Sequence, residues 1–200
     1  MKCPETDAGF ADSPIHGADV QRRLLQSVLP FCKTRRRALD IGAHIGLWTT
    51  QLALRFKHVD AFEPERVNFG CLKANALEFD NVTLHETAVG ADHGRCRVVN
   101  LGANSGCGFV TRGGDSPIVP IDSFDFQDVD FIKLDIEGYE GRALTGAVDT
   151  LKKSKPVVFF EDNGLGAVHF GPAWVDPKTV LQELGYRHRA RIAKNELWTA

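Results

Sequence analysis

Residues 37–54 read RALDIGAHIGLWTTQLAL, and this stretch decides the fold. Its beginning, residues 38–41, is a short apolar run that predicts a buried strand. Apolar residues then recur at three- and four-residue steps, which predicts a helix with one face against a sheet. Gly42 and Gly46 stand between the two and allow a sharp turn with a close approach of helix to strand. The pattern is typical of a strand, a tight turn and a helix whose edge binds a flat ligand.

A carboxylate, Asp40, lies at the end of this predicted strand. A dinucleotide site would have a third glycine here and bare helix N–H groups for the pyrophosphate, whereas Asp40 would repel an anion. The turn therefore argues against nicotinamide-dependent reduction. It favours a ligand that carries positive charge.

A second acid follows one crossover later. Residues 57–62, KHVDAF, predict a second strand, and Glu63 comes directly after it. At the tip of a second parallel strand, a carboxylate can accept hydrogen bonds from both vicinal hydroxyls of a ribose. Glu63 could also be a solvated acid at a helix start, because Pro64 favours the first turn of a helix. Together with the glycine turn upstream, the pattern favours Glu63 as the ribose ligand.

The alternation of strands and helices continues along the chain. Residues 81–86 predict a third strand, and its end at residues 87–90 is where the strand would pass a bound base. Ala88 is therefore a candidate for cofactor binding. Strand, helix, strand, helix and strand in this order predict a parallel sheet with right-handed crossovers.

Residues 91–121 interrupt this rhythm. Two short alternating runs, residues 96–101 and 108–111, are joined by a glycine-rich tip, which predicts a hairpin. Loops of this size in a compact domain are usually functional lids or disordered segments. We interpret residues 91–121 as a lid-like hairpin on the substrate side, with a passive insertion as the alternative.

Three carboxylates follow two later apolar strands. Residues 131–134 predict a strand that ends at Asp135, with Glu137 close behind, and residues 155–160 predict another strand that ends at Glu161. The carboxyl ends of parallel strands meet at the edge where such sheets bind ligands. These three acids are our catalytic candidates, because one of them could accept the proton of an alcohol.

Two other polar residues near these acids are interpreted as structural. Glu140 complements the positive start of a single helix predicted over residues 139–151. His169 lies in a glycine-rich connector, where a lone histidine is typically an incidental surface residue. Residues 186–199 predict a final hairpin.

Composition limits the possible classes of protein. The 200 residues suit one ordinary domain, and 43% hydrophobic residues can fill one core. The formal net charge of −2 does not imply extended contact with nucleic acid. The only basic run, residues 35–37, is interpreted as a solvated connector. Residues 1–16 are polar and predict a flexible arm, and residues 17–200 a single domain.

Cysteine usage and hydropathy indicate the compartment. The five cysteines are odd in number and form no Cys-x-x-Cys pair, which indicates a reduced, cytoplasmic protein without a cysteine-built metal site. No residue is assigned as a metal ligand. The N-terminus lacks the apolar core of a signal peptide, and no apolar run has membrane-spanning length. We expect a soluble protein that does not enter the membrane.

With these blocks in order, the chain resembles FkbM-type methyltransferases, a family of S-adenosylmethionine-dependent enzymes with the class I methyltransferase fold. The resemblance extends over about residues 38–186, through ALDIGAHIGLWT, AFEPE, ETAVG, FIKLDIEGYEGRALTGA and PVVFFE. It implies a Rossmann-like α/β sandwich: a mostly parallel seven-stranded sheet with an antiparallel last strand and helices on both faces. It also implies S-adenosyl-L-methionine as cofactor and S-adenosyl-L-homocysteine as product.

The resemblance assigns residues to the cofactor. These are the turn residues Asp40, Gly42, His44 and Gly46, the ribose ligand Glu63, and Asp135 near the methionine end. His44 stands where the family pattern has asparagine, so only its place in the backbone turn is carried over. Carboxylates at Asp40 and Asp135 would balance the positive sulfonium and ammonium groups of the cofactor.

The acceptor expected from the resemblance is a hydroxyl group of a small molecule, sugar or natural product. No Asn-Pro-Pro-Tyr-like block, which suits exocyclic amino groups, follows the fourth strand. Methylation of RNA, with residues 35–37 contacting its backbone, is an alternative enzyme function. A cofactor-binding or scaffold module without chemistry is an alternative of another class, and the intact strand-end acids argue against it. No oligomeric state is assigned.

Overall fold

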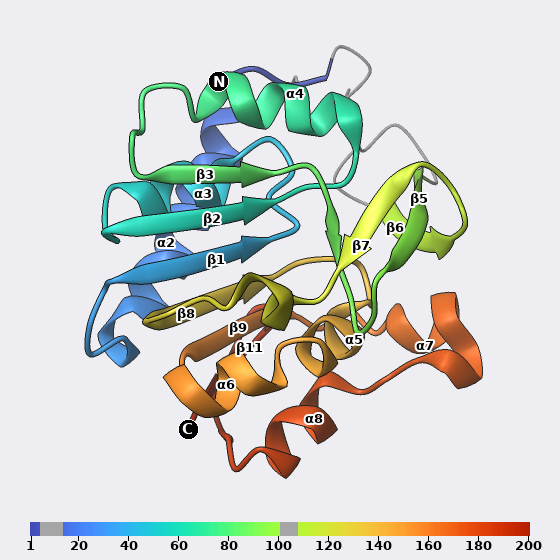
Figure 1. The fold of residues 1–200 in the computed structure, drawn as a ribbon. Helices are drawn as coiled ribbons and strands as arrows, with labels where there is room; N and C mark the ends of the chain where they lie inside the picture. The colour runs from blue at the N-terminus through green and yellow to red at the C-terminus, as the bar shows by residue number, and fades with distance from the viewer. Residues whose placement is uncertain (5–13, 101–107) are drawn as a thin grey trace.

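The structure is a computed structural model that describes residues 1–4, 14–100 and 108–200. Its main sheet has seven strands: β1 (Arg37–Ile41), β2 (His58–Phe62), β3 (Val82–His85), β8 (Val129–Leu134), β9 (Val157–Glu161), β10 (Arg187–Ile192) and β11 (Asn195–Thr199). Their spatial order is β10-β11-β9-β8-β1-β2-β3 (Figure 1).

The direction of the strands confirms the predicted sheet. β1 is parallel to β2 and β8, β2 to β3, and β8 to β9, whereas β11 is antiparallel to β9 and β10. Asp40 lies opposite Ala61 of β2 and Lys133 of β8. The carboxyl ends of β1, β2, β8 and β9 therefore meet at one edge, as parallel pairing requires.

Helices cover both faces of the sheet, as the resemblance implied. One face is covered by α2 (Pro14–Val28), α3 (Leu47–Ala53) and α4 (Arg66–Asn75); the other by the 3₁₀ helix η3 (Ile121–Phe124), α5 (Glu140–Thr145), α6 (Val148–Ser154) and α8 (Pro177–Glu183). Alternation along β1 explains this: Ala38 faces α2 and α3, while Leu39 and Ile41 face α5 and α6. Aromatic rings fill the first interface, where Trp48 stacks on Phe131 with centroids 6.2 Å apart.

A second, smaller sheet lies beyond the carboxyl ends of the main strands (Figure 1). It contains β4 (Ala88–Val89), β5 (Gly94–Asn100), β6 (Gly108–Arg112) and β7 (Ser116–Val119) in the order β4-β7-β5-β6. β5 and β6 pair antiparallel, so the hairpin predicted within residues 91–121 is confirmed for its two strands. The predicted tip, residues 102–107, lies outside the described residues.

The helix predicted over residues 139–151 is two helices, α5 and α6, and that prediction is wrong. They separate at Gly146, where a Cβ atom would lie 2.0 Å from the Gly90 carbonyl oxygen. The Asp122 carboxylate then caps α6 by accepting the backbone N–H groups of Asp149 (3.0 Å) and Thr150 (2.9 Å). The terminal hairpin of β10 and β11 is as predicted.

The N-terminal arm predicted over residues 1–16 is only partly described. Lys2 exchanges two hydrogen bonds with the Asn75 side chain of α4: its backbone nitrogen donates at 2.6 Å and its carbonyl oxygen accepts at 2.8 Å. α2 begins at Pro14, inside the predicted arm. Among the residues described, no helix combines the length and apolar character that crossing a bilayer would require.

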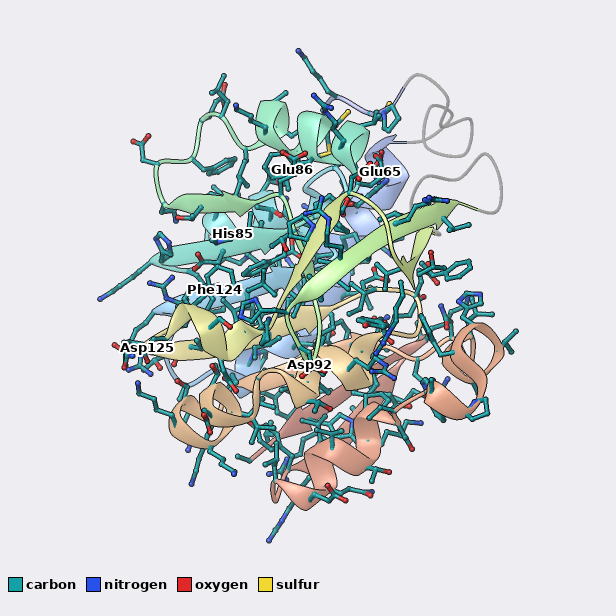
Figure 2. The ribbon with its side chains drawn as sticks, turned by 45° about the vertical axis from the view of Figure 1, so that its right-hand side comes forward. Glu65, His85, Glu86, Asp92, Phe124 and Asp125 are labelled. Carbon is teal, nitrogen blue, oxygen red and sulfur yellow. The ribbon has the colours of Figure 1, made fainter. Side chains whose placement is uncertain are left out.

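The basic run of residues 35–37 is only partly the solvated connector expected from the sequence: Arg35 is exposed, whereas Arg36 and Arg37 are paired with aspartates. Arg36 forms ion pairs with Asp128 and with Asp130, the latter at 2.6 Å. Arg37 pairs with the buried carboxylate of Asp60, which also contacts the imidazole of His85 at 2.9 Å. Figure 2 shows His85 at the end of β3 beside Phe124 of η3, and their ring centroids are 5.0 Å apart.

Candidate active site

The loop between β1 and α3 has the sharp turn that its glycines predict. Gly42 has φ +78°, and a Cβ atom there would lie 2.0 Å from the Asp135 carbonyl oxygen, so only glycine fits. His44 has φ +52°, a left-handed conformation that asparagine and histidine tolerate better than most residues. Gly46, with φ +95°, is the N-cap of α3 and lies against Leu72.

Glu63 follows β2 and is held by this loop. Its Oε2 accepts the backbone N–H of His44 at 2.8 Å, and its Oε1 accepts that of Glu65 at 2.9 Å. The residue is 6% exposed, and burial raises the pKa of Glu63 to about 7. Because each carboxylate oxygen can accept two hydrogen bonds, both can still accept from a ligand. The carboxylate is therefore positioned to bind the two hydroxyls of a ribose.

A cavity of about 230 Å³ lies at the carboxyl ends of β1, β2 and β8. It is lined by residues of α2 (Gln21), the turn (Gly42 and His44), α3 (Trp48), the end of β2 (Glu63), α4 (Asn68), the second sheet (Val98, Gly108 and Val110) and the end of β8 (Lys133 and Asp135). The second sheet thus supplies one wall of the cavity, where the sequence predicted a lid.

Asp40, at the end of β1, is paired within the protein. It is fully buried, accepts the Thr49 hydroxyl at 2.6 Å, and lies 3.3 Å from the Lys133 ammonium. Lys133 also donates to the Gly42 carbonyl oxygen at 2.8 Å. Asp40 is not among the residues that line the cavity, and its carboxylate pairs with Lys133, which does line it.

Lys133 is a site residue that we did not predict. Burial alone would lower its pKa, but the carboxylates of Asp40 and Asp135 hold the pKa above its usual value, so the side chain is an ammonium. It therefore brings positive charge to the wall of the cavity. The sequence feature that could have identified it is a single lysine within the otherwise apolar run FIKL.

The three predicted catalytic acids lie together. One oxygen each of Asp135, Glu137 and Glu161 lies within 4.8 Å of the others. Asn163 Nδ2 donates to Glu137 at 2.8 Å and to Glu161 at 3.3 Å. Of the three, Asp135 lines the cavity, with its side chain 35% exposed. This carboxylate cluster, Asp135, Glu137 and Glu161, could hold either a proton or a divalent cation.

Burial, together with neighbouring negative charge, raises the pKa of two carboxyl groups of the cluster, those of Glu161 and Glu137. Burial raises the pKa of Glu161 to about 7, and the charges of Asp135 and Glu137 add to the effect. Burial and the charge of Asp135 also raise the pKa of Glu137. The backbone of Glu137 is left-handed, at φ +54°, a strained conformation of the kind found at functional sites. The carboxylate cluster can therefore take up a proton near neutral pH.

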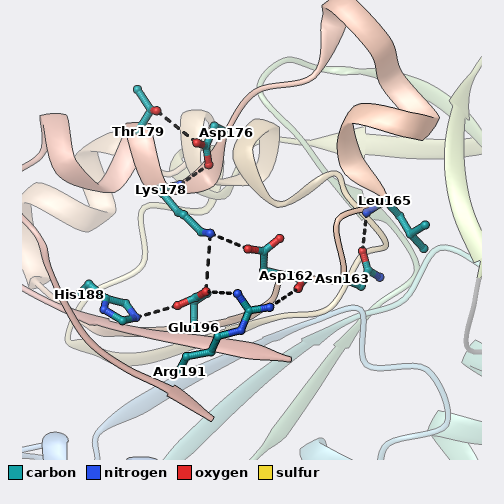
Figure 3. A network of polar contacts seen from close by, with 9 residues as sticks. All are labelled: Asp162, Asn163, Leu165, Asp176, Lys178, Thr179, His188, Arg191 and Glu196. Carbon is teal, nitrogen blue, oxygen red and sulfur yellow. Dashed lines mark hydrogen bonds and ion pairs between the residues drawn. The ribbon is translucent and has the colours of Figure 1, made fainter. Parts of the chain in front are cut away.

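A network of ion pairs anchors the chain that carries Asn163 (Figure 3). The buried Glu196 contacts Lys178, His188 and Arg191 at 3.6, 2.7 and 3.2 Å. Lys178 also pairs with Asp162 at 2.6 Å. α8, β10 and β11 thus fix the residues that follow β9, and with them the amide that contacts the carboxylate cluster.

His169 is not the incidental surface residue that we expected. It belongs to α7 (Gly166–Phe170), and its Nδ1 lies 3.2 Å from the Glu137 carbonyl oxygen. Its ring stacks on Phe109 of β6, with centroids 4.1 Å apart. The second sheet therefore reaches α7 beside the carboxylate cluster.

Two other predictions have opposite outcomes. Glu140 is structural, as interpreted: its Oε1 accepts the backbone N–H groups of Ile136 (3.0 Å) and Gly138 (3.3 Å).

Ala88 is not brought to the cavity, because β4 belongs to the second sheet and Ala88 packs there with Cys96 and Ile118. The sequence near Ala88 does not show that the chain changes sheets after residue 85.

The sequence matches the methyltransferase FkbM domain over residues 40–188. The chain belongs to the FkbM methyltransferase family. It is similar in structure to an FkbM methyltransferase from Methylobacillus flagellatus KT, with a TM-score of 0.56 and 20% identity over 83% of this chain. It spans 44% of the length of that protein.

Two other solved structures show how widely this fold is shared. A precorrin-6y C5,15-methyltransferase from Geobacter metallireducens GS-15 has a TM-score of 0.53 and 15% identity, over 91% of this FkbM-family chain and 86% of its own. A putative RNA methyltransferase from Pyrococcus horikoshii has a TM-score of 0.50 and 14% identity, over 92% and 80%. None of the curated proteins matches the sequence.

Proposed function

We propose that this FkbM-family protein transfers a methyl group from S-adenosyl-L-methionine to a hydroxyl group of a small molecule, sugar or natural product. Membership of the family implies a methyltransferase that uses this cofactor. The observation that carries the choice of oxygen as acceptor is the carboxylate cluster of Asp135, Glu137 and Glu161, because an alcohol must lose a proton as it is methylated.

The cavity residues support this cofactor. Glu63 is fixed by two backbone N–H groups and would accept the ribose hydroxyls. Asp135 lines the cavity and would face the methionine ammonium, while Lys133, already paired with Asp40, limits the net negative charge. Gln21 Oε1 is buried without a hydrogen-bond partner in the described part of the chain and could accept from a ligand.

The proposed step is an in-line displacement. With S-adenosyl-L-methionine bound, the acceptor oxygen would attack its methyl carbon, and the electron pair of the broken carbon–sulfur bond would stay on sulfur to give S-adenosyl-L-homocysteine. The hydroxyl proton passes to the carboxylate cluster, where a pKa of about 7 for Glu161 suits a general base at neutral pH. The protein otherwise supplies alignment and shields the reacting atoms from water.

The experiment is methyl transfer from labelled cofactor to a panel of sugars and phenols, in the wild type and in Asp135→Asn, Glu137→Gln and Glu161→Gln. Turnover is expected to fall about a hundredfold or more in the variant that removes the proton acceptor, while Glu137→Gln and Glu161→Gln bind the cofactor normally. In the wild type, kcat/KM is expected to rise with pH through about 7, because the base must lose its proton. Glu183→Gln, an exposed acid of α8, is the matched control.

Two results would contradict this mechanism. Wild-type turnover in all three variants would remove the carboxylate cluster from the reaction. Loss of turnover on chelation, restored by Mg²⁺, would reassign the carboxylates as metal ligands.

RNA methylation through residues 35–37 receives no support from the geometry. Arg36 and Arg37 are paired with aspartates. Arg36 precedes β1 and Arg37 begins it, so both lie at the opposite edge of the sheet from the cavity. RNA binding that weakens steeply with salt would reopen this alternative. The cytoplasmic location inferred from the cysteines stays a prediction.

A further inference from the structure

A second cavity, of about 440 Å³, lies where the root of the β5–β6 hairpin meets α5. Its charged and polar walls are Asp92, His93, Arg95, Arg112, Tyr139 and Arg142. It is separate from the cofactor cavity. Val110 lines the cofactor cavity and Tyr139 lines the second one, and both pack on the same small apolar cluster around Cys96.

The second cavity is strongly basic. Three arginines line it against one acidic residue, Asp92, which Figure 2 shows in the loop after β4, above α5. Arg95 donates to the carbonyl oxygens of Gly114 (3.0 Å) and Asp115 (2.6 Å). Arg142 donates to the Ala173 carbonyl oxygen at 2.9 Å. Backbone carbonyls orient these two side chains but do not neutralise their charges.

Two donors in this cavity have no hydrogen-bond partner in the part of the chain that the structure describes. One is the side chain of Arg112, which is exposed on β6 and forms no ion pair there. The other is the hydroxyl of Tyr139, whose ring lies 5.9 Å beneath the Arg142 guanidinium. Beside them, a Cβ atom on Gly113 would meet nothing within 4 Å, so the wall next to Arg112 is open.

We propose that Arg95, Arg112, Arg142 and Tyr139 bind a phosphate group. The planar fork of a guanidinium matches the paired oxygens of a phosphate, and several such groups together favour a dianion. The Tyr139 hydroxyl adds a neutral donor. The cavity has room for more than the phosphate alone, so the ligand is either the free anion or a phosphorylated small molecule.

This site does not depend on the proposed methyl transfer. Its ligand would contact the second sheet through Arg95 and Arg112, and α5 through Arg142. Because binding to the folded state alone raises stability, phosphate is also expected to raise the melting temperature of the protein.

The test is calorimetric titration of the full chain with inorganic phosphate and, separately, with glucose 6-phosphate. Arg112→Ala and Arg142→Ala are each expected to weaken binding at least about tenfold, because each removes a charged hydrogen-bond donor. The control is Arg97→Ala, an exposed arginine of β5 outside the cavity, which is expected to bind as the wild type does. Thermal unfolding of each variant without ligand confirms that it is folded.

Higher affinity for the sugar phosphate would identify a phosphorylated molecule as the ligand, and equal affinity would identify the free anion; both support the site. Failure of the wild type to bind either probe would overturn the proposal. Binding that Arg112→Ala leaves unchanged, or that Arg97→Ala weakens as much, would overturn it too.

Discussion

At the scale of single residues, buried glutamates distinguish this site. Burial raises the pKa of Glu63, Glu140 and Glu161 to about 7 in each case, well above the ordinary value of 4.5. Between about pH 4.5 and 7, these glutamates therefore stay protonated in the folded protein, whereas in the unfolded chain they have lost their protons. These glutamates stabilise the fold in their acid forms, and that stabilisation is lost as the pH rises through this window.

Glu140→Gln tests this directly, because glutamine keeps the acceptor for Ile136 and Gly138 and cannot ionise. We compare the unfolding free energies of the variant and the wild type at each pH. From pH 5 to pH 8, the difference is expected to shift by about 1 to 3 kcal/mol in favour of the variant. Urea unfolding at both pH values measures the difference, with the exposed Glu183→Gln as control. A difference that does not change with pH would contradict the assigned burial effect.

The positions of residues at the ends of predicted strands were foreseeable, because the carboxyl ends of parallel strands meet at one edge of the sheet. Asp135, Glu137, Glu161 and Glu63 lie at the edge predicted for them. The role of Asp40 was not foreseeable, since its partner Lys133 comes from another strand. The contact of His169 with Phe109 likewise joins segments far apart in the sequence.

At the scale of elements, apolar periodicity did not reveal where α5 ends. The pattern continues through residue 151, but Gly146 lies against the Gly90 carbonyl oxygen and Asp122 caps a new helix. These contacts come from segments that precede the helix by more than twenty residues. Long-range contacts of this kind override a local pattern.

Two glycine substitutions separate crowding from helix propensity. Gly146→Ala places a Cβ atom 2.0 Å from the Gly90 oxygen, and we expect it to cost about 1 to 3 kcal/mol of stability. Gly70→Ala, in α4 with nothing within 4 Å, is expected to add about 0.5 to 1 kcal/mol through helix propensity. Thermal unfolding measures both. Equal effects of the two substitutions would show that the junction of α5 and α6 is not crowded.

At the scale of the whole molecule, the fold brings the residues proposed for cofactor binding and for catalysis to one edge of the sheet. The glycine turn, Glu63 and the carboxylate cluster meet at the carboxyl ends of the parallel strands, and the second sheet forms a wall over them. The parallel direction of the sheet was predictable because strands and helices alternate along the chain and each strand block has a recognisable end. The cavity wall made by the second sheet was not predictable, because it depends on how the inserted residues fold back onto the domain.

The most direct test of the central claim is calorimetric titration with S-adenosyl-L-methionine and S-adenosyl-L-homocysteine, with NADH as control ligand. We expect both sulfur compounds to bind the wild type with micromolar affinity and NADH not to bind. Glu63→Ala should lose this binding, because the ribose loses its carboxylate, whereas Glu78→Ala, an exposed acid after α4, should keep it. Absence of binding to the wild type, or full affinity in Glu63→Ala, would contradict the account.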